Sequence, residues 1–248
     1  MTDLVDLINQ SQGAPISTWL PHVVSEMFKA EMSCDDLMEW AAGESPQAIV
    51  QCVVELDTLF PKPDGPDDPW SKWAPGNHAT VSSLLRNAAR IHGAERSPIV
   101  VVGLRRAGVG SYVDEFLSTV ACWFLAPKIR KAVVSLEAAQ LHKDARSVLR
   151  AVGGERQITR VIEVVDYFTQ HGELKYRDAI LDIMADSRNR FMAGIESTSS
   201  GEVRDVLISR IPPGDKAEYA DALSDAGYGE LAEKVNRLPA FYNHKPPF

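Results

Sequence analysis

The stretch VIEVVDYFTQHGEL, residues 161–174, decides the fold because it fits two structures that serve different functions. As a strand and a loop, it would open a phosphate-binding site in an enzyme. As a helix, it is an apolar stripe, since the apolar residues from Val161 to Phe168 recur at steps of three and four and the pattern stops at Gly172. The loop would need an acidic pair after the strand, whereas Asp166 stands alone. We therefore predict a helix here.

The segment PIVVVGLRRAGVGSY, residues 98–112, presents the same choice between strand and helix. Its glycines do not match the GxxxxGK[ST] or GxGxxG spacing of phosphate loops. Pro98 suits the start of a helix, and Gly108 suits its end. A helix is the preferred interpretation, and phosphate binding by Arg105 and Arg106 beside the glycines stays open as an alternative.

The rest of the chain follows a helical period, and no segment sustains the alternation of period two that a strand requires. The longest break holds five prolines between positions 61 and 75. Trp70 and Trp73 lie in this break, where we expect their rings to pin it onto a neighbouring surface. The predicted organisation is an acidic N-terminal helical module (1–60), a Pro- and Trp-rich connector (61–77), helical-hairpin repeats (78–238) and a C-terminal tail (239–248).

Equivalent residues recur at a spacing of 32 in the second half of the chain, at Leu104, Leu136 and Phe168. Each is followed four positions later by a predicted turn residue. The pairs, with one further copy, are Leu104 with Gly108, Leu136 with Gln140, Phe168 with Gly172, and Leu223 with Gly227. Glycine suits such a turn because a helix often ends on a left-handed residue. Helical hairpins at a fixed period stack, because one hairpin cannot bury its apolar face alone.

In repeat length and turn glycines, residues 97–238 resemble the tetratricopeptide and pentatricopeptide class of helical repeats. The Trp, Tyr and Pro signature positions of tetratricopeptides are not matched, so no binding residue is carried over. The resemblance implies a fold class, namely an all-α protein with an N-terminal helical module followed by a right-handed α-solenoid-like stack of helical hairpins.

The charges divide unevenly along this chain of 248 residues, whose net charge is −8. Residues 1–70 hold 13 acids against Lys29 and Lys62, whereas residues 105–160 hold ten basic residues and five acids. The basic middle is expected to face an acidic partner or the acidic N-terminal part of its own chain. Its basic residues are Arg105, Arg106, Lys128, Arg130, Lys131, Lys143, Arg146, Arg150, Arg156 and Arg160. The candidate partner-binding residues are Arg105, Arg106, Arg130, Lys131, Arg146, Arg150, Trp70 and Trp73.

The sequence lacks the motifs of several kinds of functional site. Cys34, Cys52 and Cys122 are odd in number and far apart, which predicts reduced, buried thiols in the cytoplasm. No HExxH, no Cys-x-x-Cys and no GxSxG occurs, so neither a metal site nor a serine nucleophile is predicted. The sequence contains no run of 18 apolar residues, so no membrane-spanning helix is predicted.

The leading hypothesis is a non-enzymatic scaffold or adaptor that binds a peptide or partner protein on a helical-repeat surface, without a cofactor, a metal or catalytic residues. One alternative is an RNA- or DNA-binding repeat protein that uses the basic region 105–160. A second alternative is a phosphoribosyltransferase-like or nucleotide-binding enzyme built on residues 98–110 and 161–174.

Overall fold

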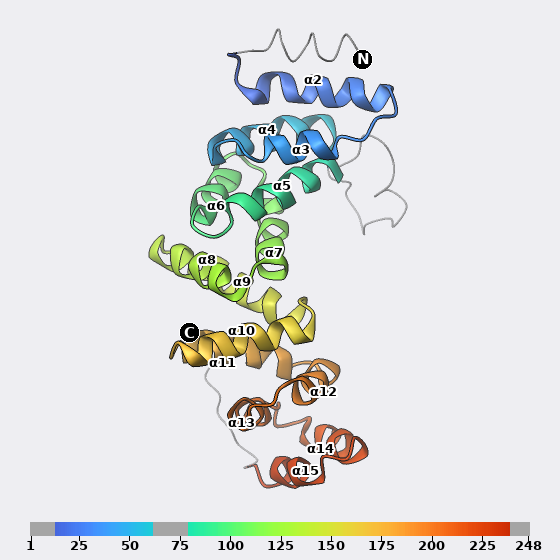
Figure 1. Ribbon diagram of the computed structural model, residues 1–248, viewed down its shortest axis with the longest axis vertical. Coiled ribbons are helices and arrows are strands. Elements are labelled where there is room, and N and C mark those ends of the chain that lie inside the picture. The colour runs from blue at the N-terminus through green and yellow to red at the C-terminus, as the bar shows by residue number, and fades with distance from the viewer. Residues whose placement is uncertain (1–12, 62–78, 239–248) are drawn as a thin grey trace. The chain divides into compact units, whose positions relative to one another are not determined.

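The computed structural model describes residues 13–61 and 79–238, and every regular element in these two ranges is helical (Figure 1). The prediction of an all-α chain is thus confirmed for the described residues. The helices are α2 (Ile16–Lys29), α3 (Asp35–Ala41), α4 (Pro46–Leu59), α5 (Ala79–His92), α6 (Ser97–Arg106), the short 3₁₀ helix η2 (Gly110–Tyr112), α7 (Val113–Trp123), α8 (Ala126–Ala138), α9 (His142–Gly154), α10 (Ile158–Gln170), α11 (Leu174–Ala185), α12 (Arg188–Ser197), α13 (Gly201–Ser209), α14 (Lys216–Asp225) and α15 (Gly229–Asn236).

Both ambiguous segments are helical. Residues 161–170 belong to α10, which buries Val161, Val164 and Phe168. Residues 98–106 belong to α6. The predictions of helix are confirmed at both places, and the strands that a nucleotide-binding site would need at these positions are not formed.

Five of the described helices end on the same turn: α2 ends so at Glu31, and the other four turns lie at the positions that the sequence predicts to be equivalent. Gly108, Gln140, Gly172 and Gly227 all have positive φ, between 62° and 86°. At Gly172, the amide of Glu173 donates to the carbonyl of Phe168 at 2.9 Å, and the amide of Gly172 itself donates to Thr169. The same pair of bonds forms at the other four turns. This is the Schellman arrangement, which satisfies carbonyls that the end of a helix leaves without a partner.

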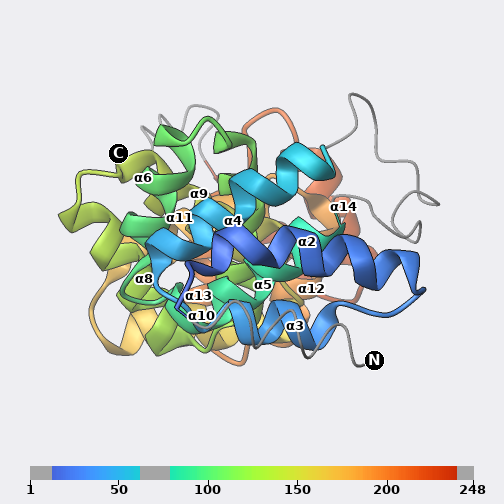
Figure 2. The same ribbon diagram turned by 90° about the horizontal axis from the view of Figure 1, so that it is seen from above.

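The molecule divides into two units, of which the first comprises residues up to Val120 together with Val134–Leu141. In this unit α4 packs against α2, α5 and α6, and α3 packs against α5 (Figures 1 and 2). The approach of α6 to α4 is close because position 103 is glycine. A Cβ atom there would lie 2.8 Å from a methyl carbon of Val50.

Polar contacts fix the ends of these helices in the first unit. The hydroxyl of Ser45 accepts the amide of Ala48 at 3.2 Å and so caps the start of α4. Helix α3 begins two residues after Ser33, and Ser33 Oγ accepts the amide of Asp35. The buried Tyr112 donates to Asp57 at 2.5 Å, and burial together with this bond raises its pKa.

The second unit comprises Ala121–Val133 and the residues from His142 onward. Its helices contact one another in a regular order. Adjacent helices pack together in the pairs α10–α11, α11–α12, α12–α13 and α14–α15. Helices two apart also pack together, in the pairs α9–α11, α10–α12, α11–α13, α12–α14 and α13–α15. Helices α10, α11 and α12 therefore each lie against both the next helix and the one after it.

The division into units does not follow the predicted connector at residues 61–77. Helices α4 and α5, from either side of that segment, pack together within the first unit. The division instead falls within α7 and α8, which each contribute residues to both units. Residues 62–77 of the connector, with Trp70 and Trp73, and the tail 239–248 lie outside the described residues.

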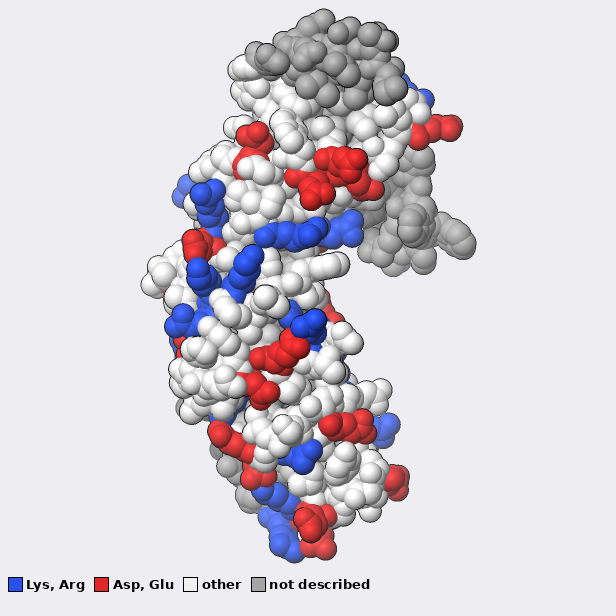
Figure 3. Space-filling view, viewed as in Figure 1, with Lys and Arg blue, Asp and Glu red and all other residues white. Residues whose placement is uncertain are grey.

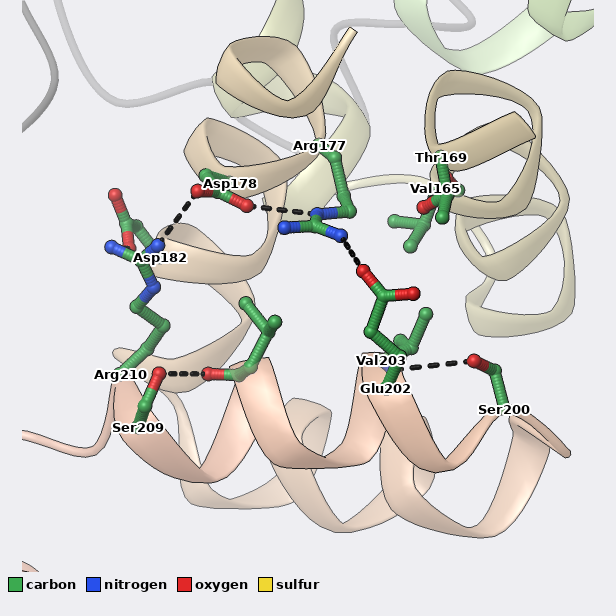
Figure 4. A network of polar contacts seen from close by, with 11 residues as sticks. Val165, Thr169, Arg177, Asp178, Asp182, Ser200, Glu202, Val203, Ser209 and Arg210 are labelled. Carbon is green, nitrogen blue, oxygen red and sulfur yellow. Dashed lines mark hydrogen bonds and ion pairs between the residues drawn. The ribbon is translucent and has the colours of Figure 1, made fainter. Parts of the chain in front are cut away.

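A charged network ties α11 to α13 within the second unit (Figure 4). The nearly buried side chain of Arg177 pairs with Asp178 at 2.8 Å and with Glu202 at 2.6 Å. Arg210 pairs with the other oxygen of Asp178 at 2.8 Å and with Asp182 at 3.2 Å. Asp178 thus lies between two guanidinium groups and neutralises charge that burial would otherwise make costly.

Replacing Asp178 with Asn should lower the free energy of unfolding by about 2 kcal/mol, because it leaves two largely buried guanidinium groups without a shared carboxylate. The matched control is Asp205→Asn. Asp205 pairs with Lys234 at the surface, where both side chains are about half exposed, so its replacement should cost less than about 1 kcal/mol. Urea unfolding followed by circular dichroism measures both values. Equal losses in the two variants would contradict the role given to Asp178.

Changing the turn residues should shift stability in opposite directions at two equivalent sites. Gly172→Ala should lower the free energy of unfolding by about 1 kcal/mol, because alanine is strained at a φ of 69° while the space around it is open. Gln140→Gly should raise it by a few tenths to about 1 kcal/mol. Gly201→Ala, at the exposed start of α13, should have no such cost. A stabilising effect of Gly172→Ala would contradict the argument.

Candidate interaction surface

The basic residues of the middle region fall into two groups, those used inside the fold and those left at the surface. Arg156 belongs to the first group, since it is 5% exposed and its Nη1 donates to the carbonyl of Ala121 at 2.6 Å. Burial lowers the pKa of this guanidinium. Arg156 therefore caps the C-terminal end of α7 and is not accessible to a partner.

Two further arginines of this region are engaged by acidic side chains. Arg130 Nε lies 2.7 Å from Glu173 Oε1, and this hydrogen bond is the main cause that raises the pKa of Arg130. Arg160 pairs with Glu163 at 2.9 Å on the surface of α10. Arg130, one of the predicted partner-binding residues, is thus already paired with Glu173.

Three members of the second group lie on one face of α9, namely Lys143, Arg146 and Arg150, which we call the basic face of α9. All three side chains are exposed, while Val148 and Val152 on the other side of the helix are buried. Among the described residues, no carboxylate forms an ion pair with any of the three, and Arg146 bonds only weakly to the carbonyl at the start of its own helix. Figure 3 shows Lys and Arg side chains gathered over α8 and α9.

Repulsion makes the basic face unfavourable for α9 on its own. Like charges three or four residues apart on a helix destabilise it by roughly 0.2–0.5 kcal/mol per pair. Lys143 and Arg146 form one such pair, and Arg146 and Arg150 form another. No contact of the core depends on these three side chains, so the arrangement suits the binding of external negative charge.

The other candidates of the basic region lie elsewhere. Arg105 and Arg106 are exposed in the last turn of α6, where positive charge stabilises the negative end of the helix dipole. They belong to the first unit, whereas Arg146 and Arg150 belong to the second. Lys131 is exposed on α8, also in the second unit.

Two exposed apolar residues were missed by the sequence argument. Trp123 is 69% exposed and Leu125 is 63% exposed, at the link between α7 and α8 in the second unit. The only sequence feature that could have indicated their exposure is that they lie shortly before Pro127, between two predicted helices. Neither the helical period nor a motif distinguishes them from core residues.

The first unit contains an open cavity of about 400 Å³ between the start of α2, the middle of α4 and Ala107. Val50, Gln51 and Glu55 are among the residues that line it. None of the predicted site residues that the structure describes contributes to this cavity.

Comparison with protein-family models, with curated proteins and with solved structures finds no match for this chain. Within residues 13–61 and 79–238, no helix combines the length and the apolar character required to cross a bilayer. In the same two ranges, no three His, Cys, Asp or Glu side chains are grouped so that they could hold a metal ion.

The cysteines should differ in reactivity. Burial raises the pKa of Cys34 to about 11 and that of Cys52 to about 12, whereas Cys122 is only partly buried. Both thiols are therefore protonated at pH 8 and react slowly with alkylating reagents. We expect Cys122 to be alkylated first in the native protein, with the other two reacting only in denaturant. Mass spectrometry after differential alkylation tests this, and rapid native labelling of Cys52 would contradict it.

Proposed function

We propose that this chain is a non-enzymatic protein-interaction module that binds a peptide or partner protein on the surface of stacked helical hairpins. The observation that carries the proposal is the basic face of α9. Three positive side chains share one exposed helix face, and no carboxylate among the described residues neutralises them. A partner that supplies carboxylates would relieve their repulsion and gain three charge-assisted contacts.

The packing of the second unit supports the stacked arrangement. Contacts between adjacent helices and between helices two apart are what a two-layered array of hairpins requires, because each hairpin then covers the apolar face of its neighbour. The recurring Schellman turns support the same arrangement. We infer a right-handed α-solenoid-like stack in which the exposed helix faces are available for binding.

The same three charges would also attract nucleic acid, which is the competing function. Phosphate contacts release counterions, so binding to RNA or DNA should weaken steeply as salt rises. The acidic balance of the chain, with a net charge of −8, disfavours a polyanion of that length over a partner that bears a few carboxylates. We therefore place a protein partner first.

The proposal is tested by reversing charge on the basic face of α9. Arg146→Glu combined with Arg150→Glu should weaken the complex by about tenfold or more, equivalent to about 1.4 kcal/mol, because attraction becomes repulsion. The partner is captured with the wild-type chain, identified, purified and titrated calorimetrically against both proteins. Arg237→Glu, at an exposed site of the same unit, is the matched control and should leave the affinity unchanged.

Two results would contradict the proposal. One is an unchanged affinity of the purified partner for the doubly substituted chain, with its folding verified by circular dichroism. The other is the recovery of RNA or DNA as the bound species, with an affinity that falls steeply between low and high salt.

A further inference from the structure

Trp123 and Leu125 are the two most exposed large apolar side chains among the described residues. Phe124 between them is 5% exposed, so the link turns its middle residue inward and the two flanking residues outward. Single exposed apolar residues are common on protein surfaces, but an exposed Trp beside an exposed Leu is a typical centre of a binding surface.

The backbone that carries these two side chains is held in place. The carbonyl of Leu125 accepts the amides of Lys128 and Ile129, at 2.9 and 3.1 Å, which begins α8. On the other side, the Arg156 guanidinium holds the carbonyl of Ala121. A link fixed at both ends loses little conformational entropy on binding, which favours affinity.

The surroundings of the link are positive. The first turn of α8 contains no acidic residue, although negative charge would stabilise that end of a helix. Lys128 is exposed there instead, with its Nζ 5.3 Å from the centre of the Phe124 ring. Lys131 is exposed one turn further along. The apolar pair is thus bordered by cations and by the positive end of the α8 dipole.

The link also adjoins one end of α9. Arg156, two residues beyond the end of α9, bonds to Ala121, two residues before Trp123. The basic face of α9 extends from Lys143 to Arg150, about 10 Å along the helix axis. The apolar anchor therefore lies near the C-terminal end of the helix that carries the row of positive charges.

We propose that Trp123, Leu125 and Lys128 form the anchor of a binding surface for an acidic amphipathic segment of a partner protein. Apolar side chains of that segment cover Trp123 and Leu125, and its carboxylates meet Lys128 and the basic face of α9. This inference rests on the proposed interaction function and specifies its partner chemistry. Such a segment complements the positive charges around the apolar centre.

The test uses labelled synthetic probes and fluorescence anisotropy. One peptide carries Leu at helical steps of three and four with Glu elsewhere, a second has the same composition with the Leu residues dispersed, and a third probe is a dT oligonucleotide. The wild-type chain should bind the first peptide most tightly. Trp123→Ala should weaken that binding about tenfold or more and Lys128→Glu several-fold, because the anchor and its adjacent charge are removed.

Leu174→Ala is the matched control, since Leu174 is also an exposed leucine of the second unit, at 45%. It should leave the affinity unchanged. Equal binding of the two peptides, tighter binding of the oligonucleotide, or no effect of Trp123→Ala would overturn the inference. A wild-type dimer that Trp123→Ala dissociates in sedimentation would also overturn it, because a second copy would then be the occupant.

The two proposals fail in different ways. If Trp123→Ala leaves the affinity of the purified cellular partner unchanged while the Arg146/Arg150 double variant abolishes it, the interaction function stands and the anchor is wrong. If neither change alters that affinity, both are wrong.

Discussion

The ends of several helices depend on one hydrogen bond, from the amide after a left-handed residue back to a carbonyl five positions earlier. This bond lets a helix end within a single turn and lets the next begin almost at once, as after Phe168, where α11 starts at Leu174. A looser ending would leave carbonyls to be solvated by water and would separate the apolar faces that consecutive helices share. Gln140 shows that the geometry, rather than glycine itself, is the requirement.

Arginine side chains bond to the carbonyls at helix ends that lack a left-handed residue. Arg156, Arg190 and Arg204 each direct a guanidinium to two backbone carbonyls in the second unit. Arg204 bonds to Ile195 and Thr198, at the end of α12, where the turn has no left-handed residue. These arginines cap helix ends. Fewer positive charges are therefore available to a partner than the number of Lys and Arg residues indicates.

The all-helical fold was predictable because it depends on local periodicity and on turn chemistry, both of which a sequence displays. The candidate surface was only partly predictable. Arg150 and Arg156 are close neighbours in the chain and alike in chemistry, yet one is exposed and the other is buried against Ala121. That difference arises from which helix packs beside which, and a single sequence does not contain it. Trp123 escaped prediction for the corresponding reason, since an apolar residue is assumed to be internal until its neighbours are known.

The guanidinium contacts also connect helices that are distant in the chain. Arg190 of α12 donates to the carbonyls of Gly153 and Arg156, and Arg156 in turn donates to Ala121. A nascent chain therefore cannot form these contacts at the end of α9 until Arg190 of α12 has been synthesised, 37 residues after Gly153. Truncation before α12 would remove the hydrogen bonds from Arg190. A shortened form that ends between α10 and α11 would therefore leave the carbonyls of Gly153 and Arg156 without this donor.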